Sequence, residues 1–256
     1  MKIALYGHGK MGSAIEEQAT ARGHEVILRV TSKNAGEAPT GADVAIEFST
    51  PKHALANMRL CVDHGVPVVV GTTGWYDRLA EVERMVAQAQ GGLLWASNFS
   101  IGVNLLFRVN RYLATLMDDQ QDQHVHIEEV HHVRKVDAPS GTAITLARDI
   151  DLKTRRYTGH VLVPAPFGPG QLEGQSGPGP VPIVVERTGD VTGEHSVIWT
   201  GPHDRITLRH EAFDRNGFAL GAVRAAEWLV GRKGLYSMDD LLGHAWSTGA
   251  TSRSDK

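Results

Sequence analysis

The chain has 256 residues, with 26 lysines and arginines, 29 aspartates and glutamates, and a formal net charge of −3. This balance argues against a dedicated nucleic-acid-binding protein, which usually carries a basic bias. The single cysteine, Cys61, excludes an internal disulfide and a cysteine-based zinc finger. We find no signal-peptide pattern and no apolar run near the ~20 residues that span a bilayer. We therefore expect a cytoplasmic protein that binds neither nucleic acid nor membranes.

The first third of the chain alternates strand and helix patterns. Apolar runs predict strands at 2–6, 25–30, 44–49, 66–70 and 93–97, and helical spacing predicts helices at 10–22, 52–64 and 76–90. Thr50 and Pro51 form an N-cap followed by proline at the first helical position. This alternation, with strands that are apolar throughout, predicts an α/β fold with a parallel sheet covered on both faces.

The pattern changes after about residue 103. We expect a helix at 103–117, a strand within 124–133, β-branched strands at 182–188, 195–200 and 206–212, and a last helix at 217–231. Short turns join these later strands, which favours an antiparallel or mixed sheet. The Pro/Gly-rich stretch 164–182 is predicted as a long irregular loop, either a lid or a surface excursion. The polar tail 247–256 is expected to fray.

A glycine-rich turn follows the first strand. The residues Gly7, His8, Gly9, Lys10, Met11 and Gly12 form G-x-G-x-x-G between a predicted strand and a predicted helix. The glycines permit a tight turn, close approach of a pyrophosphate and close helix–strand packing. The turn therefore predicts dinucleotide binding, the alternative being a turn that binds nothing.

Three further segments lie where a nucleotide would extend. The second strand is followed by Ser32 and Lys33 rather than by the acidic residue that holds the ribose of NAD, which favours NADP(H). Two other predicted strands end on the same edge of the sheet. They are followed by Gly71, Thr72 and Thr73, and by Ala96, Ser97, Asn98 and Phe99. We expect these residues to contact the cofactor.

The segment 128–143 is the most unusual part of the chain. If the strand continues, His131 shares a face with Val133 and Lys135. A helix predicted to begin near residue 143 leaves the N–H groups of Gly141 and Thr142 available to a carboxylate. Histidine and lysine beside such donors predict a pocket for a small polyanion, with both side chains capable of proton transfer.

A metal site is the alternative for the histidines of this region. His124 and His126 alternate on the predicted strand, and His131 and His132 are adjacent. Arg134 and Lys135 would oppose a cation, so we expect no bound metal. For His124 and His126 we favour a solvated polar strand.

Taken together, the motifs resemble the dihydrodipicolinate reductase family, across nearly the whole chain. The matching segments are Gly7–Gly12, Gly71–Gly74, Asn98–Asn104, Glu129–Ala143, Arg187–Asp190 and Gly193–His195. The resemblance implies NADPH- or NADH-dependent reduction of 4-hydroxy-tetrahydrodipicolinate in lysine and diaminopimelate biosynthesis. By motif match, His131 is expected to be the catalytic acid/base and Lys135 the proton donor. His132, Gly141 and Thr142 are expected to contact the carboxylates of the substrate.

The family also implies a domain plan. A Rossmann-type dinucleotide-binding domain would comprise 1–103 and 212–256, with an inserted mixed α/β domain at 104–211 that binds substrate and forms a homotetramer. Many family members have one more residue in the first glycine turn and an acidic residue after the second strand, and both are missing here.

Two other functions remain as alternatives. A different two-domain Rossmann dehydrogenase is one, and its semialdehyde-type form would need a nucleophilic cysteine. Cys61 lies within a predicted amphipathic helix and is expected to be a packing residue. An NAD(P)H-binding redox sensor is the other, but a sensor would not require the 128–143 segment.

Overall fold

The computed structural model describes residues 1–164 and 179–243 and divides the chain into two compact units. The first unit comprises Met1–Phe99 and the chain from Ala219 onward, and the second comprises Ser100–Phe218. The boundaries predicted from the sequence, after residues 103 and 211, differ from these by four and seven residues, and the roles assigned to the two domains stay predictions. Most of the predicted 164–182 loop and the whole 247–256 tail fall outside the described residues. None of the described helices combines the length and apolar composition needed to cross a membrane.

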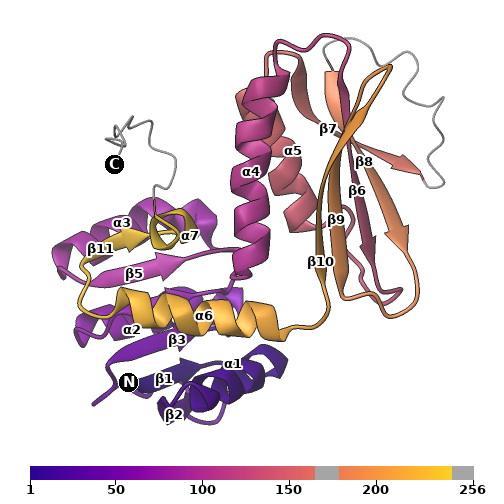
Figure 1. Cartoon of the computed structure of the whole chain (residues 1–256). Coiled ribbons are helices and arrows are strands. Elements are labelled where there is room, and N and C mark those ends of the chain that lie inside the picture. The colour runs from indigo at the N-terminus through magenta and orange to yellow at the C-terminus, as the bar shows by residue number, and fades with distance from the viewer. Residues whose placement is uncertain (165–178, 244–256) are drawn as a thin grey trace, which may run out of the picture. The chain divides into compact units, whose positions relative to one another are not determined.

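The first unit is built on a parallel sheet of six strands (Figure 1). The strands are β1 (Lys2–Tyr6), β2 (Glu25–Val30), β3 (Val44–Glu47), β4 (Val68–Val70), β5 (Gly92–Trp95) and β11 (Gly234–Tyr236). Their order is β11-β5-β4-β3-β1-β2, and all neighbours are parallel. β2 and β3 lie on opposite sides of β1, so the direction in which strands are added reverses there. In α/β sheets, ligands bind beyond the carboxyl ends of the strands at such a switch point.

Helices flank this sheet. They are α1 (Lys10–Ala21), α2 (Pro51–Asp63), the short 3-10 helix η1 (Tyr76–Arg78), α3 (Leu79–Gln88), α6 (Asn216–Leu229) and α7 (Met238–Leu241). Every residue of β4 is fully buried, as expected for a strand covered on both faces. Cys61 is a fully buried core residue of α2, and burial raises the pKa of its thiol to about 12. The packing role predicted for Cys61 is confirmed.

The second unit contains a mixed sheet of five strands in the order β10-β9-β6-β8-β7. The strands are β6 (His124–His131), β7 (Tyr157–Pro164), β8 (Gly179–Arg187), β9 (Gly193–Thr200) and β10 (Arg205–Ala212). The pairs β6–β8 and β7–β8 are parallel, whereas β6–β9 and β9–β10 are antiparallel. The predicted fold class, a Rossmann-type sheet plus a mixed α/β part, is confirmed.

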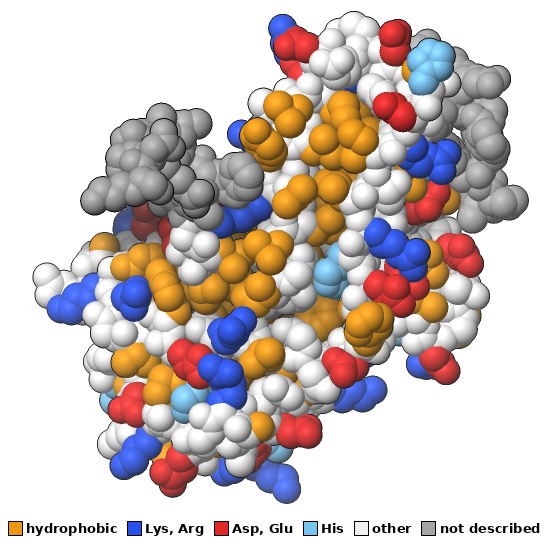
Figure 2. Space-filling model, viewed as in Figure 1, with side chains coloured by type: hydrophobic (Ala, Val, Ile, Leu, Met, Phe, Trp, Pro, Cys, Tyr) orange, Lys and Arg blue, Asp and Glu red, His pale blue; other side chains and the backbone are white. Residues whose placement is uncertain are grey.

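Two helices, α4 (Ile101–Met117) and α5 (Gly141–Lys153), pack together against one face of the mixed sheet (Figure 1). Ser100 caps α4, because its Oγ accepts a hydrogen bond from the backbone N–H of Val103. The far side of α4 leaves large apolar side chains 47–53% exposed, seen as an orange run in Figure 2. These are Leu105, Val109, Tyr112 and Leu116.

Among the described residues, three elements were not predicted from the sequence. β7 has Gly159 at φ +67° and a register shift before His160, which break its alternation. β11 has three residues and α7 has four, so neither is long enough to show a periodicity.

Candidate active site

The glycine turn has the backbone geometry that its spacing predicted. Gly7 lies at φ +93°, and a Cβ there would lie 2.2 Å from the carbonyl oxygen of Phe48. A Cβ on Gly12 would lie 2.2 Å from the carbonyl oxygen of Gly7. Both positions therefore require glycine. Gly9, the N-cap of α1, has no atom within 4 Å of an added Cβ and so faces open space.

The other residues of this turn lie at the start of α1. Lys10 and Met11 occupy its first turn, and the His8 ring is 2.7 Å from a carboxylate oxygen of Glu16. Glu16 also accepts hydrogen bonds from Arg29 at the end of β2. The Arg29 hydrogen bond, helped by His8, lowers the pKa of Glu16 to about 2. The side chain of Arg29 is therefore bound to helix α1 through Glu16.

Ser32 and Lys33 lie in an exposed turn after β2. The side chain of Asn34 shapes this turn, accepting from the backbone N–H of Thr31 at 2.8 Å and donating to the carbonyl of Arg29 at 3.1 Å. The Lys33 side chain therefore belongs to an ordered turn at the open edge of β2.

The two remaining predicted segments follow β4 and β5 on the same edge of the sheet. A Cβ on Gly71 would lie 2.1 Å from the ring of Phe48, which packs on Phe99 with ring centroids 5.5 Å apart. Thr72, Ala96 and Phe99 are buried, whereas Thr73 and Ser97 are exposed; Asn98 lies between these extremes. Glycine positions that admit no side chain, together with open space at Gly9, fit a dinucleotide held by backbone groups.

Glu47 is a buried carboxylate below this edge that sequence reasoning missed. Its Oε1 accepts hydrogen bonds from the backbone and hydroxyl of Ser49 and from the side chain of Asn57. Burial raises the pKa of Glu47, and the hydrogen bonds only partly oppose this effect. The sequence did not indicate that this carboxylate is buried, because burial of the last residue of β3 follows from the packing around the strand and not from its own polarity.

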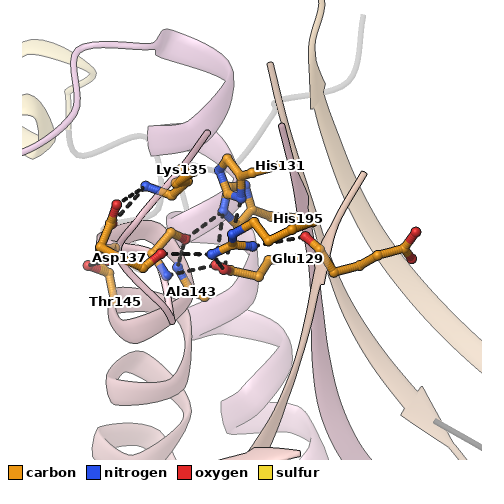
Figure 3. Close-up of polar contacts among 11 residues, drawn as sticks. Glu129, His131, Lys135, Asp137, Ala143, Thr145 and His195 are labelled. Carbon is orange, nitrogen blue, oxygen red and sulfur yellow. Dashed lines mark hydrogen bonds and ion pairs between the residues drawn. The ribbon is translucent and has the colours of Figure 1, made fainter. Parts of the chain in front are cut away.

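In the second unit, β6 ends at His131 and a turn follows. The predicted alternation of His131, Val133 and Lys135 along one strand is therefore wrong. Along β6, Val125 and Ile127 belong to the core against the helices, and Glu129 and His131 continue the same face. Glu129 pairs with His195 on β9, and His131 pairs with Arg187 on β8. The register of three strands thus places four polar side chains together at one end of an apolar face (Figure 3).

His131 is buried among these groups, with 7% of its surface exposed. Its ring lies 5.0 Å from that of His195, and a Cβ on Gly193 would lie 3.0 Å from its Nε2, so glycine gives the ring room. Burial lowers the pKa of His131 to about 4; Glu129 opposes this, whereas Lys135 and Arg187 reinforce it. Burial, together with His131, lowers the pKa of His195 to about 3. Both imidazoles are neutral at pH 7.

Lys135 lies in the loop between β6 and α5. Its Nζ donates to both carboxylate oxygens of Asp137, at 2.8 and 2.7 Å (Figure 3). This hydrogen bond lowers the pKa of Asp137. His132 is half-buried, and its Nδ1 finds no hydrogen-bond partner among the described residues. The side chain of Lys135 is therefore bound to a carboxylate of its own loop.

Helix α5 begins at Gly141, two residues earlier than predicted. Ser140 is its N-cap and accepts from the backbone N–H of Ala143 at 3.2 Å. Gly141 and Thr142 are the first two residues of the helix, where N–H groups and the helix dipole favour an anion. No atom lies within 4 Å of an added Cβ on Gly141.

Glu129, Arg187, His195 and Ser140 were not predicted as site residues. The sequence signal for them was their place inside the family-like segments Glu129–Ala143, Arg187–Asp190 and Gly193–His195. What the sequence lacked was the strand register, which alone brings these segments together.

Ligand atoms of Glu129, His131 and His195 lie within 4.8 Å of one another, a spacing that a metal ion could use. However, Arg187 donates to one carboxylate oxygen of Glu129 and the Ser140 N–H to the other, so the carboxylate is already neutralised within the chain. The expectation of no metal stays a prediction.

The solvated strand predicted for His124 and His126 is wrong for His126. Only 5% of its surface is exposed, its Nε2 lies 3.2 Å from Glu128, and burial lowers its pKa. The reason is its place on the central strand of the sheet, where neighbouring strands cover both flanks.

Comparison with known proteins decides the family. The models described as dihydrodipicolinate reductase, N-terminus and C-terminus, match residues 1–99 and 102–242. The chain belongs to the dihydrodipicolinate reductase family. It is therefore a pyridine-nucleotide-dependent oxidoreductase of lysine and diaminopimelate biosynthesis, and another dehydrogenase or a redox sensor is not favoured.

Individual relatives agree with this membership. A 4-hydroxy-tetrahydrodipicolinate reductase of Christiangramia forsetii is 40% identical over 94% of this chain and 98% of its own length. One from Neisseria meningitidis serogroup C is 36% identical over 95% and 97%. The solved structure of a dipicolinate-bound dihydrodipicolinate reductase from Paenisporosarcina sp. TG-14 has the same fold, with a TM-score of 0.73, 23% identity, and coverage of 93% and 97%.

Proposed function

We propose that this chain catalyses the reduction of 4-hydroxy-tetrahydrodipicolinate to tetrahydrodipicolinate, with the second unit binding the substrate and the first unit binding NADPH or NADH. The observation that carries the assignment of the second unit is the group of polar side chains and backbone donors at the start of α5. There, a buried neutral His131 and the ammonium group of Lys135 lie in one chain segment with a helix N-terminus. A dicarboxylate needs cationic and N–H donors, and its reduction needs a proton source.

In this proposal the chain's own residues bind and orient the substrate. His132, Lys135 and the first N–H groups of α5, at Gly141 and Thr142, hold the two carboxylates. The substrate loses its 4-hydroxyl as water and becomes a conjugated imine. A nucleotide held by the first unit would supply the hydride for C4. One proton from the site then completes tetrahydrodipicolinate, so that the reduced nucleotide and one proton are consumed and one water is released.

Lys135 is the better candidate for the proton donor. His131 has a pKa of about 4 without substrate, because burial and the nearby cations disfavour the imidazolium, so at pH 7 it is neutral and a weak acid. Lys135 holds an ammonium group at the pocket through Asp137. His131 then acts as the neutral partner that accepts or relays a proton after the carboxylates of the substrate have added negative charge.

In the first unit, the proposed cofactor contacts are the predicted ones, Gly7–Gly12, Ser32, Lys33, Gly71–Thr73 and Ala96–Phe99. Both nucleotides are expected to work. NADPH is favoured, because exposed Lys33 lies just after β2, where the ribose is held, and no acidic residue stands in the run 31–34 that directly follows this strand.

The second unit is also the proposed site of assembly into a homotetramer. The exposed apolar side chains on α4 support association, since contiguous apolar patches usually mark contact surfaces. A cytoplasmic location suits the single free cysteine. Light scattering of the purified protein would measure the assembly, and a monomeric mass would contradict the proposal.

The decisive test is an absorbance assay at 340 nm with the substrate generated in place from pyruvate, aspartate semialdehyde and a synthase. We expect oxidation of NADPH and NADH that depends on the synthase product. Lys33→Ala should lower kcat/KM for NADPH by up to about fivefold, the worth of an exposed ion pair, and leave NADH unchanged. Lys153→Ala, an exposed lysine of α5, is the control. Folded protein that oxidises neither nucleotide would refute the substrate assignment.

A further inference from the structure

The carboxylate of Glu129 is fully buried and lies 3.9 Å from the ring of His131, a residue of the proposed substrate site. Its Oε1 accepts from Nη2 of Arg187 at 2.8 Å, and its Oε2 accepts from the backbone N–H of Ser140 at 2.8 Å (Figure 3). The rings of His131 and His195 each approach it to 3.9 Å. A carboxylate buried this deeply is stable only when its charge is matched, and here the Arg187 guanidinium and the Ser140 N–H supply the match.

Through Arg187, Glu129 also controls the loop that carries Lys135. The same Nη2 of Arg187 donates to the carbonyl oxygen of Asp137 at 2.8 Å. Arg187 therefore binds the chain at Asp137, and Glu129 binds it at Ser140. Both points lie close to Lys135, whose Nζ is bound to the Asp137 carboxylate. Two other contacts tie the loop to the segment between β8 and β9: the Val133 N–H donates to the carbonyl oxygen of Gly189, and Arg134 pairs with Asp190. Both lie before Lys135 in the chain, whereas the contacts of the Glu129–Arg187 pair lie after it.

Through Ser140, Glu129 sets the start of α5. The Ser140 N–H is bound to Glu129, while its Oγ caps the helix at Ala143 and lies 2.9 Å from Nε2 of His195. Ser140 thus joins Glu129 and His195 to the first turn of α5. A small displacement of the first N–H groups of α5 would misplace a bound carboxylate.

Glu129 is also the negative charge that His131 faces. Nδ1 of His131 has no hydrogen-bond partner among the described residues, and its nearest acidic neighbour is Oε1 of Glu129. The positive charges of Lys135 and Arg187 lower the pKa of His131, whereas the negative charge of Asp137, like that of Glu129, raises it. Burial acts to raise the pKa of Glu129 itself, but the hydrogen bonds from Ser140 and Arg187 outweigh it and keep the group ionised.

We propose that Glu129 is a positioning residue of the reductase, which, paired with Arg187, holds the Lys135 loop, the start of α5 and His131 in one arrangement. This rests on the substrate site proposed above. Glu129 does not touch the substrate in this proposal and acts only through these three partners.

The test compares Glu129→Gln with the double variant Glu129→Gln/Arg187→Met. Glutamine keeps the size and an acceptor for Ser140 but removes the charge, so Glu129→Gln should lower kcat about 10²-fold and raise KM for the substrate. The acid limb of the kcat profile should move to lower pH, because the charge that favours protonated His131 is lost. The double variant leaves no unpaired buried charge, so it should fold and yet remain impaired. Nucleotide affinity, measured by fluorescence titration, should be unchanged in both.

Arg155→Met is the matched control, because it removes an exposed ion pair with Asp118 in the same unit and should leave kcat and the pH profile unchanged. Wild-type kcat, KM and pH profile in Glu129→Gln, or wild-type kcat in the double variant, would overturn the proposal. Lys135→Ala and His131→Gln are assayed in parallel. If these two remain fully active, the proposed site itself is wrong; if they are inactive while Glu129→Gln is normal, only the role of Glu129 fails.

Discussion

The proposed nucleotide edge of the first unit and the proposed substrate site of the second are built in opposite ways. The first depends on side chains that are absent, at Gly7, Gly12 and Gly71, where a Cβ would strike the backbone or the Phe48 ring. The second depends on side chains that are buried, polar or charged, and drawn from three strands and a helix start. A backbone cradle can be specified by a short local motif, whereas a polar network needs a defined sheet register.

Two buried carboxylates make the same contrast in electrostatic terms. Both Glu47 and Glu129 are almost completely buried. Glu47 has only neutral donors, so burial prevails and its pKa is raised. Glu129 has Arg187 as well as hydrogen bonds, and these overcome burial and lower its pKa. The partner therefore determines whether a buried acid is ionised, and this difference can be tested.

The largest expected effect is on the substrate side. Lys135→Ala should reduce kcat by about 10²- to 10⁴-fold, because it removes the proposed proton donor, while circular dichroism shows an unchanged fold. The neighbouring Arg134→Ala removes a solvent-exposed ion pair with Asp190 and serves as the control. Near-normal turnover in Lys135→Ala would show that proton delivery does not need this side chain.

A smaller effect, on stability, should separate two glycines of one turn. Gly12→Ala places a methyl group 2.2 Å from the carbonyl oxygen of Gly7 and should lower the free energy of unfolding by about 1–3 kcal/mol. Gly9→Ala meets open space at φ −90° and should fold normally, yet bind nucleotide more weakly. Denaturant unfolding and fluorescence titration measure the two effects. Equal stability losses in both variants would contradict the cradle geometry.

The smallest effect is expected for Glu47→Gln. Because the folded-state pKa of Glu47 is raised, its contribution to stability is full below pH 4.5 and is lost as pH rises through the folded value. Glutamine does not ionise and so avoids this loss. At pH 5 the free energy of unfolding of the variant should lie within about 1 kcal/mol of the wild-type value, and at pH 8 the difference should shift in favour of the variant. Glu129→Gln should be destabilising throughout that range, since it leaves Arg187 without its buried partner. Urea unfolding across this pH range would show whether the two variants respond with opposite signs.

The sequence by itself determined the parts of this protein that are local. Continuous apolar runs predicted the buried parallel strands, and the spacing of glycines after the first of them predicted the nucleotide turn, because each depends on only a few adjacent residues. The family-like segments supplied His131, Lys135 and the start of α5 as candidate residues. Their roles, and those of the cofactor contacts, stay predictions for the assays above.

Only the tertiary structure decided the arrangement around Glu129. Alternation along one strand wrongly extended β6 to Lys135, because nothing local signals that the strand ends at His131. The pairing of β6 with β8 and β9 brings Arg187 and His195 beside a glutamate more than fifty residues earlier. A charge can be buried there because those distant partners neutralise it, and a pattern that covers neighbouring residues cannot reveal such a balance.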